Sequence, residues 1–116
     1  GQICVAGSRL LVQESIHDEF MERLAEAAAG ITIGGPEANA LMGPIITAAQ
    51  KERVLEYIAA GKEVAELVTG GGTPEGLEQG FFLEPTIFDR VPNSARIAQE
   101  EIFGPVLSVT TFSDQD

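Results

Sequence analysis

The segment GQICVAGSRLLV (residues 1–12) guides the interpretation of the rest of the chain. Its Cys4 is the only cysteine in the sequence and lies among small and polar residues. A thiol is a nucleophile only as its thiolate, and small neighbours leave room for a substrate and for backbone N–H groups near the sulfur. Residues 8–12 are largely apolar, which is typical of a strand covered on both faces. Taken alone, however, a single cysteine is more often a small buried apolar residue than a nucleophile.

Composition limits the classes of protein to which the chain can belong. Its 116 residues are 44% hydrophobic, which is enough for one domain of modest size. Seven Lys and Arg oppose 18 Asp and Glu, and the net charge of -11 argues against nucleic acid and anionic membranes as partners. A single cysteine excludes an internal disulfide and a zinc cluster, so we expect no metal site and a reducing, cytoplasmic location. The sequence also contains no apolar run of membrane-spanning length.

The first helix is predicted over residues 15–29. Ser15 is expected to be its N-cap, with Asp18 as a short capping-box partner, and Gly30 is expected to end it. His17 is expected to face solvent because it lies in the first turn of an amphipathic helix. The residues predicted to face the core are Ile16, Phe20, Leu24 and either Ala27 or Ala28.

A second helix is predicted over residues 48–60. Thr47 and Gln50 repeat the capping pattern before it, and Gly61 is expected to close it. The residues predicted to face the core are Val54, Leu55, Ile58 and Ala59.

Further strands are predicted over residues 65–69 and 106–112, and a pair of extended apolar runs over residues 81–83 and 85–88. One helical turn is expected at residues 96–101. The glycines at 70–72 could suggest a phosphate-binding loop, but the Gly-Lys-Ser/Thr ending of a P-loop is absent. Two helices and about four strands predict a small α/β layer structure.

Five sequence blocks, taken together, are far more specific than any one of them. They are GQIC with AGSR around Cys4, MGP (42–44), LVTGG (67–71), EPTIF (84–88) and EEIFGPV (100–106). In this order and at about this spacing they resemble the NAD(P)-dependent aldehyde dehydrogenase superfamily, over essentially the whole chain.

That resemblance implies a more definite fold. Residues 1–116 are expected to form a partial catalytic domain, with a largely parallel sheet flanked by helices in three layers. The family's separate cofactor-binding domain would lie almost wholly upstream, so we expect the chain to be a piece of a longer protein. In the family dimers and tetramers are usual, and an incomplete sheet has an exposed edge, so we expect a homo-oligomer.

The resemblance also implies a reaction and a set of site residues. Cys4 would attack an aldehyde to form a thiohemiacetal, with its own backbone N–H as half of an oxyanion hole. Hydride would pass to NAD or NADP, and water would hydrolyse the resulting thioester to a carboxylic acid. Glu101 would bind the nicotinamide-ribose hydroxyls, and Phe103 would pack near the nicotinamide. A structural and a functional role for Glu100 are equally open.

Other functions remain open on the sequence alone. The glutamate that activates water and the asparagine that completes the oxyanion hole would both lie upstream, so we expect the isolated chain to be inactive. A non-catalytic scaffold or interaction module on the same fold is one alternative. A redox-sensing thiol protein built on Cys4 is another.

Overall fold

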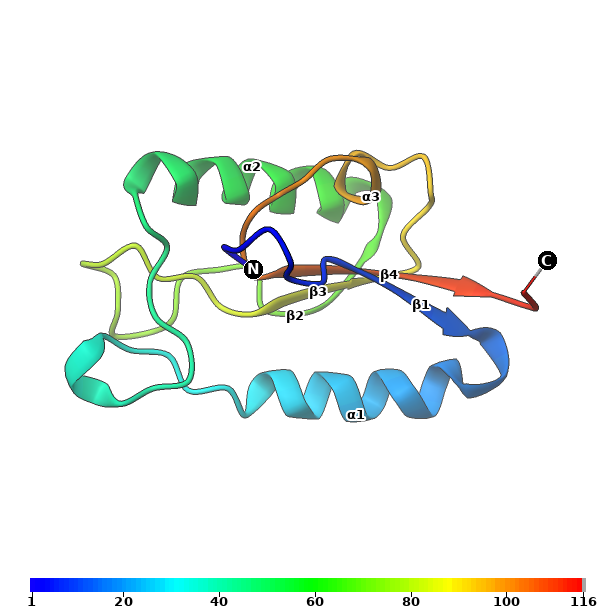
Figure 1. The fold of residues 1–116 in the computed structure, drawn as a ribbon, viewed down its shortest axis with the longest axis horizontal. Helices are drawn as coiled ribbons and strands as arrows, with labels where there is room; N and C mark the ends of the chain where they lie inside the picture. Colours follow the sequence, from blue (N-terminus) through cyan, green and yellow to red (C-terminus); the bar gives the residue numbers. More distant parts are fainter. Residues whose placement is uncertain (116) are drawn as a thin grey trace.

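The chain folds around one four-stranded sheet, described here by a computed structural model that covers residues 1–115. The strand order is β1-β4-β3-β2, with β4 parallel to both of its neighbours and β2 antiparallel to β3. Figure 1 shows three layers, with α1 below the sheet and α2 and α3 above it. The elements are β1 (Arg9–Gln13), η1 (Glu14–Ile16), α1 (His17–Ala29), η2 (Pro36–Ala38), α2 (Ala48–Val64), β2 (Glu66–Thr69), β3 (Thr86–Asp89), α3 (Arg96–Gln99) and β4 (Val106–Phe112).

Each face of the sheet has its own core. Successive side chains of a strand point to opposite faces, so Phe88 and Val106 pack toward α2 while Ile87 and Val109 pack toward α1. The central strands β3 and β4 are therefore covered on both sides, as parallel strands usually are. The predicted largely parallel sheet flanked by helices is confirmed.

The start of α2 follows the sequence prediction, but its end does not. Thr47 Oγ1 accepts a hydrogen bond of 3.1 Å from the backbone N–H of Gln50, which is the predicted cap. The helix continues past Gly61 to Val64. Gly61 is buried, and a Cβ there would lie 2.8 Å from Cζ of Phe88. This glycine therefore admits the Phe88 ring instead of ending the helix.

The prediction of which α2 residues face the core is correct in part. Val54 and Ile58 are buried and Leu55 is partly buried, but Ala59 is exposed. Tyr57, which was not predicted to face the core, is only 2% exposed.

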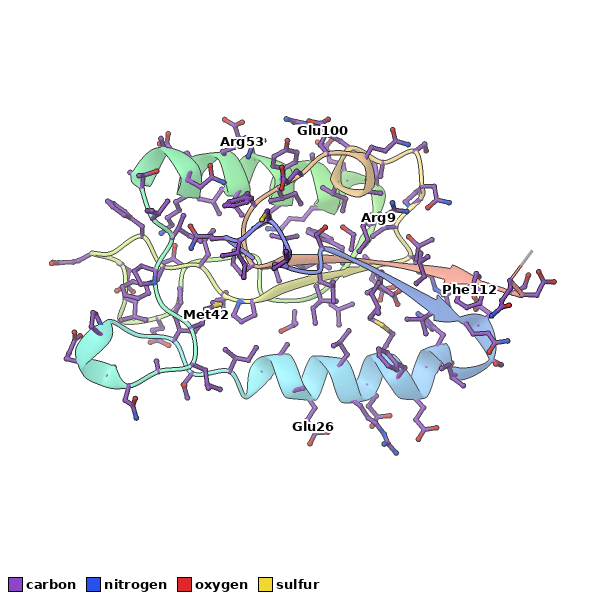
Figure 2. All side chains as sticks on the ribbon, viewed as in Figure 1. Arg9, Glu26, Met42, Arg53, Glu100 and Phe112 are labelled. Carbon is purple, nitrogen blue, oxygen red and sulfur yellow. The ribbon has the colours of Figure 1, made fainter. Side chains whose placement is uncertain are left out.

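The first half of the inward face of α1 differs from the prediction by one residue, whereas Leu24 and Ala28 face the sheet as predicted. Ile16 and Phe20 are exposed, whereas Met21 is buried. No Ser15 side chain caps the helix, because residues 14–16 form a separate 3-10 turn and the α-helix begins at His17. Figure 2 shows Glu26 pointing away from the sheet. The residues that face the sheet are His17, Met21, Leu24 and Ala28, spaced by four, three and four positions.

The expectation that His17 faces solvent is wrong. Its residue is only 5% exposed, and Nε2 lies 2.8 Å from Oδ2 of Asp89 at the end of β3. This contact turns His17 toward the sheet, and because a helix is rigid it also turns Met21 inward and Phe20 outward.

The bounds of most strands were predicted correctly, but one predicted run forms no strand and the burial of β1 was not predicted correctly. Strand β4 has the predicted bounds, and β1 and β2 lie within one residue of theirs. Residues 81–83 form no strand, and β1 is an edge strand whose Leu11 is 58% exposed, so it is not covered on both faces. Within residues 1–115, no helix combines the length and the apolar character that a membrane crossing requires.

Candidate active site

Two loops that are distant in sequence meet at the amino ends of β1 and β4. These strands are parallel neighbours, paired from Arg9 opposite Ser108, and the backbone N–H of Ser108 also donates to the carbonyl of Ser8 at 3.0 Å. Parallel neighbours begin at the same edge of a sheet, so the segment before β1 lies beside the segment before β4. The first contains Cys4 and the second contains Glu101 and Phe103.

Cys4 lies in an exposed turn in which the backbone N–H of Ala6 donates to the carbonyl of Ile3 at 3.0 Å. Gln2 anchors this turn to the segment before α2. Its amide Nε2 donates to the carbonyl of Pro44 at 3.3 Å, and its Oε1 accepts from the backbone N–H of Ile46 at 3.0 Å. One amide side chain thus satisfies a donor and an acceptor of another loop, which fixes where the thiol is presented.

Gly1 and Gly104 allow the backbones of the two loops to lie in direct contact. A Cβ on Gly1 would collide with the carbonyl of Gly104, and a Cβ on Gly104 would lie 2.6 Å from Cγ2 of Val54 on α2. The segment before β4 is therefore packed between the first residue of the chain and α2.

The predicted site residues line one small cavity of about 90 Å³. Cys4 contributes from one loop, and Glu101 and Phe103 contribute from the other. The remaining lining residues are Gly1, Ile3, Ala6, Gly7, Ser8, Ile102, Gly104 and Val106. The fold thus brings together a thiol, a carboxylate and an aromatic ring from opposite ends of the sequence.

Glu101 and Phe103 are both exposed residues that line the cavity. Within residues 1–115 no group donates a hydrogen bond to the Glu101 carboxylate, and the Phe103 residue is 36% exposed at the cavity. Phe103 has a left-handed backbone with φ of 60°, which is uncommon for a residue with a side chain. Such strain persists only where surrounding contacts hold it.

Polar side chains of α2 hold the segment that carries Glu101 and Phe103. Gln50 Nε2 donates to the carbonyls of Ile102 and Phe103, both at 3.1 Å. Arg53 donates from Nη1 to the carbonyl of Ile102 and from Nη2 to that of Glu101, both at 3.2 Å. Gln50 was predicted only as a capping partner and Arg53 was not predicted to have a role, although both lie in a polar stripe beside the apolar face of the helix.

Glu100 joins the same network through its side chain. Tyr57 donates its hydroxyl to Oε1 of Glu100 at 2.9 Å, and Arg96 Nε lies 3.2 Å from Oε2. The Tyr57 hydroxyl, helped by Arg96, lowers the pKa of the Glu100 carboxyl. Glu100 therefore turns toward α2, whereas Glu101 lines the cavity, and these contacts favour a structural role for Glu100.

The backbone at Cys4 can support covalent chemistry at a carbonyl carbon. Among residues 1–115, no group of three or more His, Cys, Asp or Glu side chains is placed to hold a metal ion. The backbone N–H of Cys4 makes no hydrogen bond within the same residues, so it is free to donate to an oxygen beside the sulfur.

Comparison of the sequence with known proteins identifies a family that matches this chain. The aldehyde dehydrogenase family matches residues 1–116. Betaine aldehyde dehydrogenase of Brucella ovis is 51% identical over 120 residues, which cover 100% of this chain and 25% of that protein.

Solved structures agree with the sequence comparison. Mycobacterium tuberculosis aldehyde dehydrogenase complexed with NAD+ is 44% identical with a TM-score of 0.95, covering 99% of this chain and 24% of that one. The Thermus 1-pyrroline-5-carboxylate dehydrogenase with bound NAD is 46% identical with a TM-score of 0.93. The match covers 98% of this chain and 22% of that one. The chain spans about a quarter of the length of these relatives. Because the family match extends over every residue of this chain, the chain belongs to the aldehyde dehydrogenase family.

Proposed function

We propose that the chain is part of the catalytic domain of an NAD(P)-dependent aldehyde dehydrogenase, and that Cys4 is its nucleophile. The reaction is oxidation of an aldehyde to a carboxylic acid. The single observation that carries the proposal is the cavity shared by Cys4, Glu101 and Phe103. The bound NAD in similar structures supports the cofactor, and the name of the Brucella relative suggests betaine aldehyde as the first substrate to test.

The first step forms a bond between the Cys4 sulfur and the aldehyde carbon. The Cys4 thiolate supplies the electron pair, and the carbonyl π electrons move to oxygen, which gives a thiohemiacetal alkoxide. The backbone N–H of Cys4 donates to this oxygen and stabilises its negative charge. The hydrogen bonds of Gln2 to Pro44 and Ile46 hold the loop that carries this N–H and the sulfur.

The second half of the reaction passes through a thioester on Cys4. When a nicotinamide dinucleotide is bound, it supplies the acceptor for the hydride that the thiohemiacetal carbon loses. The alkoxide collapses to a thioester, and water then adds to its carbonyl carbon. The C–S bond breaks, the Cys4 thiolate leaves, one proton of the water passes to solvent, and the carboxylic acid is released.

The residues beside Cys4 fit such a cofactor. An ionised carboxylate only accepts hydrogen bonds, so the Glu101 side chain, which no group among residues 1–115 engages, suits the two hydroxyls of a ribose. The exposed Phe103 ring offers a flat apolar surface for a nicotinamide.

The test uses the full-length protein that contains this chain, assayed with NAD+ or NADP+ and with betaine aldehyde and simple aliphatic aldehydes. We expect steady formation of reduced cofactor with the wild type. We expect Cys4→Ser to lose about a thousandfold or more in kcat while keeping the melting temperature. Acid quenching followed by mass spectrometry should find an acyl group on Cys4 in the wild type alone.

Two results would redirect the interpretation. Cofactor binding without turnover or an acyl adduct would favour the non-catalytic scaffold. No reduced cofactor, together with rapid formation of a glutathione mixed disulfide at the exposed Cys4, would favour the redox-sensing thiol.

We also propose that the full-length protein is a cytoplasmic homo-oligomer. The exposed edge strand β1 with its outward Leu11 supports association, and the lone cysteine suits a reducing compartment. Size-exclusion chromatography with light scattering gives the oligomeric state, and a monomer at micromolar concentration would contradict the proposal.

A further inference from the structure

We infer that Arg53 on α2 is a positioning residue for the cofactor site, acting through the backbone of the segment that carries Glu101 and Phe103. This inference rests on the proposed function, because it concerns the same site. Arg53 contacts neither Cys4 nor the cavity, so its effect passes through the residues it holds.

The segment that Arg53 holds has no regular secondary structure. Helix α3 ends at Gln99 and β4 begins at Val106, so the carbonyl groups between them need other partners. Arg53 supplies two of these partners by donating to the carbonyls of Glu101 and Ile102. A planar guanidinium presents several N–H donors in a fixed geometry, so two adjacent carbonyls are held at a defined orientation.

One face of α2 contains the whole support. Gln50, Arg53 and Tyr57 follow one another at spacings of three and four residues, which places them on the same side of a helix. Together they contact the four consecutive residues Glu100, Glu101, Ile102 and Phe103. Figure 2 shows Arg53 and Glu100 on the same side of the sheet as α2.

Arg53 is itself held in place by a buried aromatic ring. Its guanidinium carbon lies 5.2 Å from the centroid of Tyr57, and Nη2 donates to the Tyr57 hydroxyl at 3.3 Å. The guanidinium of Arg96 lies 4.5 Å from the same centroid and binds Glu100. Stacking on a ring limits the rotamers of a long side chain, so Arg53 holds the segment in one position.

The consequence concerns the Glu101 carboxylate and the Phe103 ring. The carboxylate has no partner of its own within residues 1–115, so its position depends on the backbone that Arg53 holds. The left-handed backbone of Phe103 lies next to that anchored stretch and needs such support. Loss of Arg53 should therefore loosen both groups without touching the thiol.

The experiment compares Arg53→Met, Arg53→Lys and wild type in the full-length protein. The matched control is Arg23→Met on α1, where the arginine only pairs with Glu19 on the surface. Affinity for NAD+ and NADP+ is measured by calorimetry, and steady-state assays separate kcat from the KM for the cofactor.

We expect Arg53→Met to weaken cofactor binding by about tenfold, the size typical for loss of hydrogen bonds from a charged donor. Its kcat at saturating cofactor should change by less than about threefold, since the nucleophile is untouched. Arg53→Lys keeps the charge but loses the planar fork, so it should restore only part of the affinity. The control should bind like the wild type.

A double-mutant cycle tests whether Arg53 acts through Glu101. In a Glu101→Gln background, Arg53→Met should cost less than in the wild type, because the contact that Arg53 positions is already weakened. Equal losses in both backgrounds would overturn the assignment to Glu101.

Amide hydrogen exchange supplies a readout that needs no activity. Peptides covering residues 100–104 should exchange faster in Arg53→Met than in the wild type, while peptides from β4 should not change. Unchanged exchange together with unchanged cofactor affinity overturns the inference. If the wild type binds neither dinucleotide, the proposed function fails and this role fails with it. If Arg53→Met does not fold, Arg53→Lys carries the same comparison.

Discussion

Nε2 of His17 lies 2.8 Å from Oδ2 of Asp89, a residue 72 positions further along the chain. Both side chains are almost fully buried, and the contact joins the start of α1 to the end of β3. The other ring nitrogen, Nδ1, lies 2.8 Å from Oδ1 of Asp18. With a carboxylate at each nitrogen, the ring is best satisfied when both nitrogens donate.

These contacts make the stability of the chain depend on pH. The hydrogen bond to Asp89, then that to Asp18, raises the pKa of His17, while burial and the Arg90 guanidinium oppose the rise. A raised pKa in the folded state means that the stabilisation is complete below about pH 6.5, the usual value for an unfolded histidine. It is lost as pH rises through the folded-state pKa. We therefore expect the free energy of unfolding to fall as pH rises above about 6.5.

Urea unfolding followed by circular dichroism at several pH values measures this dependence. The His17→Gln variant should show a flatter profile than the wild type over the same range. The lowered pKa values of Glu14 and Glu100 affect stability only at lower pH, so they do not confuse the comparison. Parallel profiles for the two proteins would contradict the role given to His17.

The two carboxylates around His17 should differ in importance. Asp89 and Asp18 lie at the same distance from the ring, but the Asp89 side chain is 7% exposed and that of Asp18 is 98% exposed. Asp89→Asn leaves the buried ring without its charged partner and should lower the free energy of unfolding by about 3 kcal/mol. Asp18→Asn should cost less than about 1 kcal/mol, because water screens that pair. If urea unfolding shows that both variants lose a similar amount of free energy of unfolding, burial does not set the importance of the two carboxylates.

This pair also explains why the first half of the inward face of α1 was predicted wrongly, at Ile16 and Phe20. The helix has alanines on several sides, so two choices of inward stripe, one residue apart, fit the sequence almost equally well. The His17 contact with Asp89 decides between them, and nothing local in the sequence indicates a partner 72 residues away. Gly61 is a similar case, because a side chain there would collide with the Phe88 ring, which is distant in sequence.

Features that depend on neighbouring residues were predicted well. The Thr47 cap and the bounds of β4 follow from local chemistry and apolar patterning. Cys4, Glu101 and Phe103 were predicted as site residues from resemblance to a family, and parallel pairing of β1 with β4 explains why they share a cavity. The support from Arg53 was missed because it binds backbone carbonyls, which every residue has.

Gly61 should tolerate no larger side chain. Gly61→Ala gains helix propensity, but its Cβ would press on the buried Phe88 ring, so we expect a loss of about 1–3 kcal/mol in the free energy of unfolding. The matched control is Gly43→Ala, where a Cβ would meet no atom within 4 Å. The same urea experiment measures both variants, and an unchanged or higher stability for Gly61→Ala would show that the ring can move away.

Gln2 should matter for the presentation of Cys4. Gln2→Ala removes both hydrogen bonds to the segment before α2, so the thiol turn loses its anchor. We expect kcat of the full-length enzyme to fall by about tenfold, because reaction rates are sensitive to misplacement of the nucleophile. Gln13→Ala is the control, since that side chain binds only the carbonyl of Ser113 at the opposite end of β1. Equal kcat values for Gln2→Ala and wild type would remove this role.

The 116-residue chain on its own should not oxidise aldehydes at an enzymic rate. By resemblance, the general base for hydrolysis and the second oxyanion donor are not among its residues. Purified chain mixed with aldehyde and NAD+ or NADP+ should give no steady absorbance increase at the wavelength of the reduced cofactor. Continuous production of NADH by this chain would show that its own residues suffice.

The strand order has a consequence for how the protein is made. Strand β4 lies between β1 and β3, yet it follows β1, β2 and β3 along the chain, so the centre of this four-stranded sheet leaves the ribosome after its edges. Until then β1 lacks the strand with which it pairs here, and the face of α1 lacks the part of its cover that Val109 supplies. Contacts between segments so far apart form slowly and leave apolar surface exposed meanwhile. These apolar surfaces therefore reach their full packing only after about residue 112 has been made.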